Sequence, residues 1–310
     1  MNDMKFPMFW NGNINILMFF LSVLITTVVA STQSHSSNFY CLDNVGNYTT
    51  NSIYQNNLNA LLPYLTNKAL LTTFGNASVG EGIDQVYMLY NCRGDLNLQQ
   101  CHDCINAAAH MITQECPTQR EAISWYHECM LRYANRSIFS LEEESPHSWD
   151  YLSGTDPNPQ LAKIVAENIE GLIEEAAYNK TTRGFATGEV NIALEDSIYF
   201  LVQCTPDILG SRCERCLRAA FRSMAGCCGT RRSTLMMFFP SCHIRYERAP
   251  FTLNGAKANK HRQNFPIMPS FPPPPNSGGS STRKLTSHAE IFMIGLIMPL
   301  VMLLIMPTYN

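Results

Sequence analysis

The spacing of its cysteines constrains this 310-residue chain more than any other feature of the sequence. Three of the 12 cysteines form a C-x8-C-x2-C pattern, and three others repeat it 112 residues later. The first copy consists of Cys92, Cys101 and Cys104, and the second of Cys204, Cys213 and Cys216. A pattern that recurs in the same order indicates an internal duplication, and the chain is long enough for two domains.

The duplication extends to the residues around these cysteines. Residues 87–92 (YMLYNC) and 199–204 (YFLVQC) are apolar runs typical of buried strands. After each C-x2-C pair, apolar residues follow at positions i, i+3, i+4 and i+7, which predicts a helix with one apolar face. They are Ile105, Ala108, Ala109 and Ile112 in the first copy and Leu217, Ala220, Phe221 and Met224 in the second.

Each copy also has a helical pattern upstream and strands downstream. The upstream apolar residues are Leu58, Leu61, Leu62 and Leu65 in the first copy and Ile169, Leu172, Ile173 and Ala176 in the second. Residues 122–133 and 234–246 read as strands that end in matching C-x2-R-Y sequences. Such mixed elements are accommodated when helices cover one face of a sheet. We expect an α+β fold with two tandem disulfide-stapled domains, each an antiparallel sheet with two helices packed on one face.

The N-terminus predicts export from the cell. Lys5 precedes an apolar run over residues 14–30, and Val28 and Ala30 provide a small-x-small cleavage pattern. We expect residues 1–30 to be a signal peptide; the alternative is an N-terminal membrane anchor. In an oxidising compartment an even set of cysteines predicts disulfides. Four N-x-S/T sequons fit this compartment and are expected to be glycosylated: Asn47, Asn76, Asn135 and Asn179.

Changes in composition divide the chain further. We expect the first domain over residues 37–138 and the second over residues 145–251, with a polar joint near residues 141–156. Residues 252–290 are expected to be a linker because they are rich in Pro, Ser and Gly.

The C-terminus predicts attachment to a membrane. Residues 291–306 are 16 apolar residues, and a helix of that length spans about 24 Å against roughly 30 Å of hydrocarbon. No Lys or Arg follows to hold a cytoplasmic end. The small residues 277–279 and a polar spacer precede the apolar run, as in a GPI-anchor signal, and Ser277 is the candidate attachment residue. A single-pass transmembrane helix is the alternative.

These motifs together resemble the plant ginkbilobin-homologous domain, also called the stress-antifungal domain. The likeness covers Ser37 to Phe251 and includes the C-x8-C-x2-C pattern of both copies and residues 242–247 (CHIRYE). Tandem copies of this domain occur in cysteine-rich repeat secretory proteins, in plasmodesmata-located proteins and in the ectodomains of cysteine-rich receptor-like kinases.

The resemblance implies a disulfide pairing for each copy. The implied bonds are Cys41–Cys116, Cys92–Cys101 and Cys104–Cys129 in the first domain and Cys204–Cys213 and Cys216–Cys242 in the second. The second domain has no counterpart of Cys41 and has two adjacent cysteines, Cys227 and Cys228. Three outcomes are open for these two: a bond with each other, no partner, or partners elsewhere.

The resemblance also implies a mannose site made of an Asn, an Arg and a Glu. The chain has Leu42 at the Asn position, Ile123 and Met236 at the Arg positions, and Ala134 and Glu247 at the Glu positions. Only the glutamate of the second copy matches, and we expect it to pair with a neighbouring Arg. Mannose recognition is therefore not expected at this site, and a secreted antifungal lectin is an alternative function.

The sequence offers no set of residues for catalysis or metal binding. The C-x2-C pairs lie in separate domains, whereas a zinc ribbon needs four convergent ligands. The nearby third cysteine favours structural bonds over a reactive dithiol, so a thiol–disulfide redox protein is only a further alternative. His102, His127 and His243 match no H-E-x-x-H motif, and the latter two are expected inside strands. We expect no enzyme, no metal and no cofactor.

Binding is the function that these observations leave. A net charge of −3 without long runs of one sign excludes a nucleic-acid partner. Six aromatic residues in the downstream strands either form a binding surface or fill the interior: Trp125, Tyr126, Tyr133, Phe238, Phe239 and Tyr246. We expect a non-enzymatic protein at the plant cell surface, acting in stress, defence or cell-to-cell communication. Its expected partners are cell-wall carbohydrate or cell-surface receptors, with self-association included.

Overall fold

The computed structural model describes residues 37–251 except residues 153, 194–195 and 229–231. The predicted signal peptide (1–30), the linker (252–290), Ser277 and the apolar segment 291–306 lie outside the described residues. Within the described part, no helix is both long enough and apolar enough to span a bilayer.

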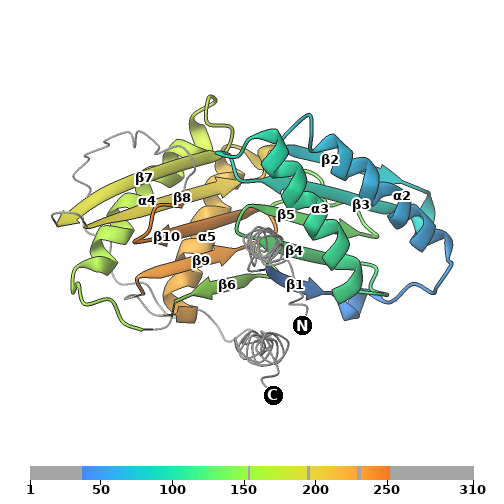
Figure 1. Ribbon diagram of the computed structural model, residues 1–310, viewed down its shortest axis with the longest axis horizontal. Helices are drawn as coiled ribbons and strands as arrows, with labels where there is room; N and C mark the ends of the chain where they lie inside the picture. The colour runs from blue at the N-terminus through green and yellow to red at the C-terminus, as the bar shows by residue number, and fades with distance from the viewer. Residues whose placement is uncertain (1–36, 153, 194–195, 229–231, 252–310) are drawn as a thin grey trace, which may run out of the picture. The chain divides into compact units, whose positions relative to one another are not determined.

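The first repeat is a five-stranded antiparallel sheet that carries both of its helices on one face (Figure 1). Its strand order is β1-β4-β5-β3-β2. The elements are β1 (Ser37–Cys41), η1 (Asp43–Val45), α2 (Ile53–Lys68), β2 (Phe74–Val79), η2 (Gly82–Asp84), β3 (Val86–Cys92), α3 (Leu98–Glu115), β4 (Ala122–Tyr126) and β5 (Cys129–Ala134). Helix α2 packs on β2 and β3, whereas α3 packs on β3, β4 and β5.

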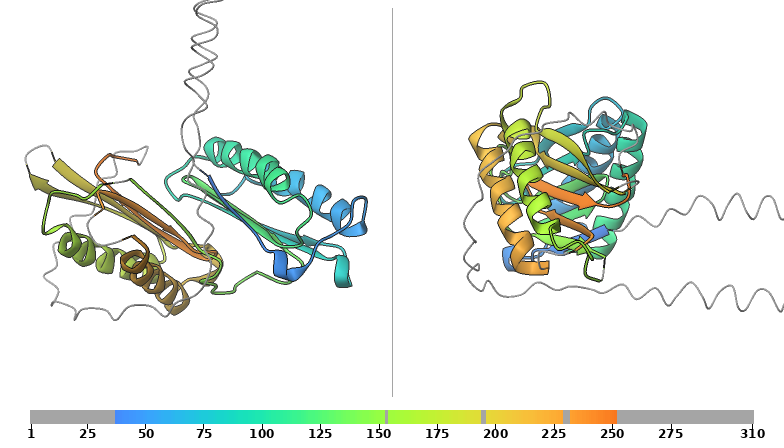
Figure 2. Two further views of the ribbon diagram at one scale, coloured as in Figure 1. Left: turned by 90° about the horizontal axis from the view of Figure 1, so that it is seen from below. Right: turned by 90° about the vertical axis from the view of Figure 1, so that its left-hand side faces the viewer.

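The second repeat reproduces this arrangement, with the strand order β6-β9-β10-β8-β7. Its elements are β6 (Ser148–Tyr151), α4 (Leu161–Tyr178), β7 (Phe185–Ala193), β8 (Asp196–Cys204), η3 (Pro206–Ile208), α5 (Ser211–Cys228), β9 (Thr234–Phe238) and β10 (Cys242–Glu247). In Figure 2 the helices of each repeat again lie on one side of their own sheet. The predicted α+β fold of two duplicated domains is confirmed.

Local sequence explains where the helices of the first repeat begin. The Oδ1 of Asn97 accepts the backbone N–H of Gln100 at 2.9 Å, and the Oε1 of Gln100 accepts the backbone N–H of Asn97 at 3.1 Å. This capping box starts α3. Ser52 caps α2 by accepting the backbone N–H of Gln55 at 3.3 Å. The predicted apolar stripes then face the sheet, and Ile105 is fully buried there.

Some details differ from the sequence prediction. No sequence pattern predicts the edge strands β1, β2, β6 and β7, and β6 lies inside the stretch near residues 141–156 that was expected to be a polar joint. His127, expected inside a strand, lies in the two-residue turn between β4 and β5. The turn is flanked by Tyr126 and Cys129, which both belong to the core beneath the helices.

The two repeats share a core at the sheet faces that the helices leave free. One buried cluster combines Leu89, Ile123, Trp125, Met130, Ala134 and Ile138 of the first repeat with Met236 and Phe238 of the second. The Nε1 of Trp125 donates a hydrogen bond to the carbonyl oxygen of Phe239 at 3.2 Å. Gln203 also joins the repeats, because its Nε2 donates to the carbonyl of Cys92 at 2.8 Å and its Oε1 accepts from the amide of Gly94 at 3.1 Å.

Candidate functional site

All 12 cysteines lie in the described residues, and all are paired. The structure contains Cys41–Cys116, Cys92–Cys101, Cys104–Cys129, Cys204–Cys213 and Cys216–Cys242, together with a bond between the neighbours Cys227 and Cys228. Each C-x2-C pair is therefore split between two strands: Cys101 joins β3, and Cys104 joins β5. In this arrangement the C-x2-C cysteines fasten a helix to its sheet and do not form a dithiol.

The three histidines considered as candidate bases lie in different surroundings. His102 lies on the partly exposed side of α3. The Nε2 of His127 lies 3.3 Å from the Oδ2 of Asp150 in β6. In β10, burial and the charges of two nearby arginines lower the pKa of His243 to about 3, which keeps its ring neutral. Within the described residues, no three His, Cys, Asp or Glu side chains are grouped as metal ligands.

The six aromatic residues considered as a binding surface lie in the interior instead. All of them are at most 5% exposed. Tyr126, Tyr133, Phe239 and Tyr246 belong to the cores beneath the helices, whereas Trp125 and Phe238 belong to the shared cluster. Alternation along the strands does place some of them on the free sheet face, but the other repeat covers that face. These residues stabilise the fold and are not available to a ligand.

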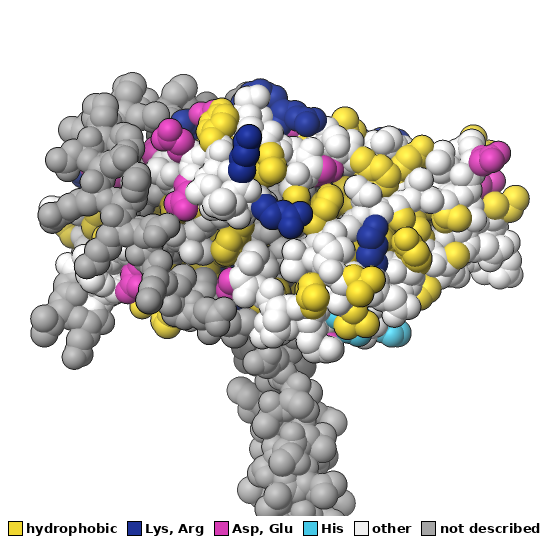
Figure 3. Space-filling view, turned by 90° about the horizontal axis from the view of Figure 1, so that it is seen from above, with side chains coloured by type: hydrophobic (Ala, Val, Ile, Leu, Met, Phe, Trp, Pro, Cys, Tyr) yellow, Lys and Arg dark blue, Asp and Glu magenta, His cyan; other side chains and the backbone are white. Residues whose placement is uncertain are grey.

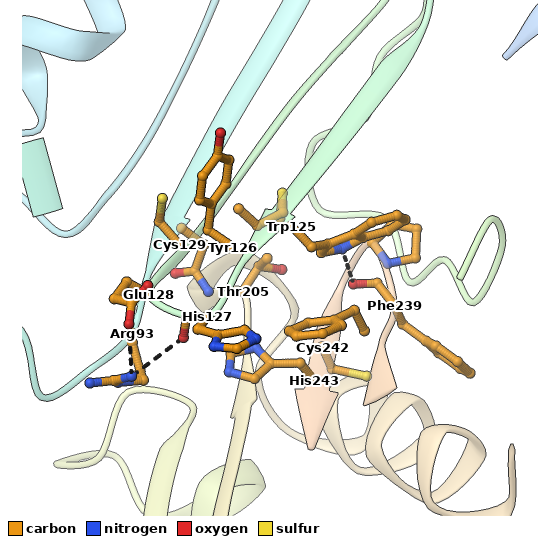
Figure 4. Close-up of a pocket in the computed structure, with 14 residues that line it drawn as sticks. Arg93, Trp125, Tyr126, His127, Glu128, Cys129, Thr205, Phe239, Cys242 and His243 are labelled. Carbon is orange, nitrogen blue, oxygen red and sulfur yellow. Dashed lines mark hydrogen bonds and ion pairs between the residues drawn. The ribbon is translucent and has the colours of Figure 1, made fainter. Parts of the chain in front are cut away.

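A cleft lies where the two repeats meet, and Figure 4 shows the residues around it. Its lining includes Asn91, Arg93, His127, Thr205 and His243. The enclosed part has room for about one water molecule, whereas small-molecule sites usually occupy roughly 300–1,000 Å³. The Nε of Arg93 is already paired with Asp95 at 2.6 Å. This cleft is therefore a small gap in the interface between the two repeats, and it is too small to hold a sugar.

The positions of the family's mannose ligands do not form a site either. Ile123, Met236 and Ala134 are buried apolar residues. The remaining carboxylate, Glu247, accepts a hydrogen bond from the Nε of Arg245 at 2.6 Å, as the sequence predicts. These positions therefore do not provide the group of hydrogen-bonding side chains that a sugar would need.

The four predicted glycosylation sites lie on different parts of the described surface. Asn47 and Asn179 are exposed, and Asn76 and Asn135 are half-buried. Asn76 lies in the edge strand β2, and Asn179 follows the last residue of α4. Each is accessible at least in part, which is what a glycan attached to the side chain requires.

An exposed apolar surface, which no sequence pattern predicts, lies at one end of the first repeat. It consists of Leu70, Leu71 and Leu98, which are 41%, 80% and 40% exposed, and we name it the Leu71 patch. The loop after α2 lies beside the first turn of α3, because the carbonyl oxygen of Thr72 is 4.0 Å from the Sγ of Cys101. On the face seen in Figure 3, apolar side chains lie among charges of both signs.

The second repeat differs from the first at the corresponding place. Thr181 and Thr182 follow α4 where the two leucines follow α2, and Gly210 stands at the position of Leu98. Thr181 is also the threonine of the Asn179 sequon. The same end thus carries exposed leucines in one copy and a glycosylation sequon in the other. Tyr178 and Leu209 of the second copy, which are 53% and 40% exposed, lie at this end too, because the amide of Gly210 donates to the carbonyl of Ala177 at 2.9 Å.

Comparison with known proteins gives the chain its relatives. A profile of the salt stress response/antifungal family matches residues 40–136 and 155–249. Cysteine-rich receptor-like protein kinase 25 of Arabidopsis thaliana is 32% identical over 271 residues, which cover 86% of this chain and 38% of the kinase. Putative cysteine-rich repeat secretory protein 7 of the same plant is 32% identical over 234 residues, covering 74% of this chain and 81% of that protein. The chain thus spans less than half of the receptor-like kinase.

Solved structures share the fold. The tandem DUF26 ectodomain of the Arabidopsis thaliana cysteine-rich receptor-like protein PDLP8 matches with a TM-score of 0.59 and 21% identity, covering 69% of this chain and 98% of that one. The corresponding ectodomain of PDLP5 matches with a TM-score of 0.57 and 22% identity. Since the family profile matches both repeats and a relative that is 32% identical covers 74% of the chain, the chain belongs to the salt stress response/antifungal family.

Proposed function

We propose that the chain is a non-enzymatic binding protein on the outer side of the plant cell and that it recognises other cell-surface proteins through the Leu71 patch. The observation that carries this proposal is the 80% exposure of Leu71, which follows the exposed Leu70 directly in the chain. Contiguous exposed apolar side chains mark interaction sites more often than isolated ones do. The relatives named as receptor-like kinases are cell-surface proteins of the same family and are the first partners to test.

The difference between the repeats supports this choice of surface. After duplication both copies had the same end available, yet the second copy carries two threonines and a sequon there. A glycan at Asn179 would shield that end from protein contacts. The first copy leaves its leucines open to solvent, at an energetic cost that burial against a partner would recover.

Carbohydrate recognition receives less support from the described residues. The six aromatic side chains of the downstream strands are buried, and the cleft between the repeats is too small. A cell-wall polysaccharide is therefore the rival ligand that the experiment must separate from a protein partner.

We further propose that the protein reaches the surface through its signal peptide and stays there through a lipid anchor at Ser277. Both features lie outside the described residues, and the support comes from the sequence. The relatives named as secretory proteins agree with an extracellular location.

The experiment compares two substitutions of exposed leucines in the full chain expressed in plant cells. Leu71→Asp removes an apolar contact from the patch, whereas Leu152→Asp alters a 62% exposed leucine of the second repeat and serves as the matched control. Burial of a leucine contributes about 1.5–3 kcal/mol, so Leu71→Asp is expected to weaken binding at least tenfold.

Binding is measured against a second copy of the chain, a panel of cysteine-rich receptor-like kinase ectodomains, and an array of cell-wall polysaccharides. Protein binding that Leu71→Asp weakens and Leu152→Asp leaves unchanged supports the proposal. Equal binding by both variants, or binding to polysaccharides alone, overturns it.

A further inference from the structure

The second repeat replaces a disulfide of the first repeat with a non-covalent contact. In the first repeat Cys41 pairs with Ala122 across the sheet, and Ala122 pairs in turn with the tyrosine of the C-x2-R-Y sequence. In the second repeat Tyr151 pairs with Leu235, which pairs with the equivalent tyrosine. Tyr151 therefore occupies the position of Cys41. Its strand, β6, has no covalent bond to α5.

Arg232 makes the connection that the missing disulfide would have made. Its guanidinium carbon lies 4.5 Å from the centre of the Tyr151 ring. Its Nε donates to the carbonyl of Cys228 at 2.8 Å, and its Nη1 donates to the carbonyl of Gly154 at 3.0 Å. One side chain thus links β6, the segment that follows β6, and the last residue of α5.

Cys228 corresponds to Cys116, since both lie 12 residues after the last cysteine of their C-x8-C-x2-C patterns. Cys116 is bonded to Cys41, whereas Cys228 has lost that partner and is bonded to Cys227. The residue whose carbonyl anchors Arg232 therefore belongs to a ring closed by two neighbouring cysteines. Opening of that ring would remove a covalent constraint from the backbone of the final helical residues.

We propose that the Cys227–Cys228 disulfide is a site of reversible reduction by dithiols and that its state decides whether Arg232 holds β6 on the second sheet. Two observations set this bond apart from the other five. It joins cysteines one residue apart, whereas the other bonds join cysteines 9, 25, 26 and 75 residues apart. Since the entropic stabilisation by a disulfide grows with the loop that it closes, this bond gains least.

Access is the second observation. Cys227 is half-buried, so this pair is not fully enclosed. Both cysteines are buried in four of the other bonds. Cys41 is also half-buried, but its bond closes the longest loop and is the one that the chain-entropy argument protects most.

The reduction is a two-electron exchange. A thiolate of the dithiol attacks the Sγ of Cys227, which breaks the bond to Cys228, forms a mixed disulfide and releases the Cys228 thiolate to take up a proton. The second thiol of the reductant, after losing its proton, attacks its own sulfur in the mixed disulfide. Cys227 then leaves as a thiolate and takes up a proton, and the dithiol becomes a cyclic disulfide.

The test uses the oxidised full chain and graded concentrations of dithiothreitol. After each step free thiols are alkylated and located by mass spectrometry, and backbone amide exchange is measured over residues 148–151. Cys227 and Cys228 are expected to be alkylated at a reductant concentration at least tenfold below that needed for any other pair. Amide exchange in β6 should rise at least tenfold at that same concentration, while exchange in β1 stays unchanged.

Two variants separate the effect of the Cys227–Cys228 disulfide from the effect of the Arg232 contacts. Arg232→Gln is expected to raise β6 exchange in the oxidised protein without changing the order of alkylation. Cys227→Ser/Cys228→Ser should raise it also and remove the response to low dithiothreitol. Alkylation of another pair first, or selective reduction that leaves β6 exchange unchanged, overturns the proposal. Both measurements are made on the natural chain, so they hold even where a variant fails to fold.

Discussion

Replacement of Gln203 with leucine is expected to destabilise both repeats together. The side chain is 4% exposed and bonds to two backbone groups of the first repeat. Leucine leaves the buried carbonyl of Cys92 without its partner, which costs about 1–3 kcal/mol. It also removes the bond to the more exposed amide of Gly94, which contributes about 0.5–1.5 kcal/mol. We expect Gln203→Leu to lower the free energy of unfolding by about 2–4 kcal/mol.

The assay is denaturant unfolding of the oxidised protein, followed by tryptophan fluorescence. Trp149 reports on the second repeat, and Trp125 reports on the contact between the repeats, since it belongs to the shared cluster. A loss of 2–4 kcal/mol corresponds to a decrease in Tm of roughly 4–16 °C for a domain pair of this size. Gln160→Leu is the matched control, because Gln160 is exposed at the start of α4 and its replacement should cost less than about 0.5 kcal/mol. Equal stability of the two variants would refute the reasoning.

Three further predictions concern the covalent framework, pH and the membrane. Cys41→Ser/Cys116→Ser should lower the free energy of unfolding by about 4 kcal/mol, because the bond closes a 75-residue separation; a loss below 1 kcal/mol in chemical denaturation would contradict this. Stability should fall as pH decreases from 6.5 toward 3, because unfolded His243 takes up a proton that burial and two arginines exclude in the folded state, where its pKa is about 3. This contribution is fully present above pH 6.5, and His243→Gln should reduce the loss between pH 7 and pH 4 in unfolding measurements; an unchanged loss argues against it. Phospholipase C should release the protein from plant membranes if Ser277 carries a lipid anchor, whereas membrane retention with residues 309–310 still present would exclude the anchor.

The sequence predicts those elements whose apolar residues are buried against other elements of the same repeat. The stripe that includes Leu58 and the one that includes Ile105 have the 3.6-residue period of helices and are buried as expected. The edge strands are different, because each pairs on one side only and needs few apolar residues. Strand β2 contains Gly75 and Asn76, which are more typical of turns, and only its pairing with β3 makes it a strand.

The candidate surface shows a second limit of sequence patterns. Trp125 and Phe238 alternate with helix-facing residues, so periodicity places them on the free face of a sheet without saying what covers it. Only contact with the other repeat decides that they are buried. The Leu71 patch lacks even this signal, since Leu70 and Leu71 lie in a loop where no periodicity applies. The one available signal was the pair of leucines at a place where the second repeat has threonines.

The shared cluster limits how such a chain can be divided. A first repeat produced alone would expose Trp125 and Ile123 on its free sheet face, and a second repeat alone would expose Met236 and Phe238. A side chain at Gly94 would collide with the ring of Phe185. Substitutions at this boundary in one repeat therefore need compensating substitutions in the other. In this chain the tandem, and not the single repeat, is the unit that keeps these apolar faces away from solvent.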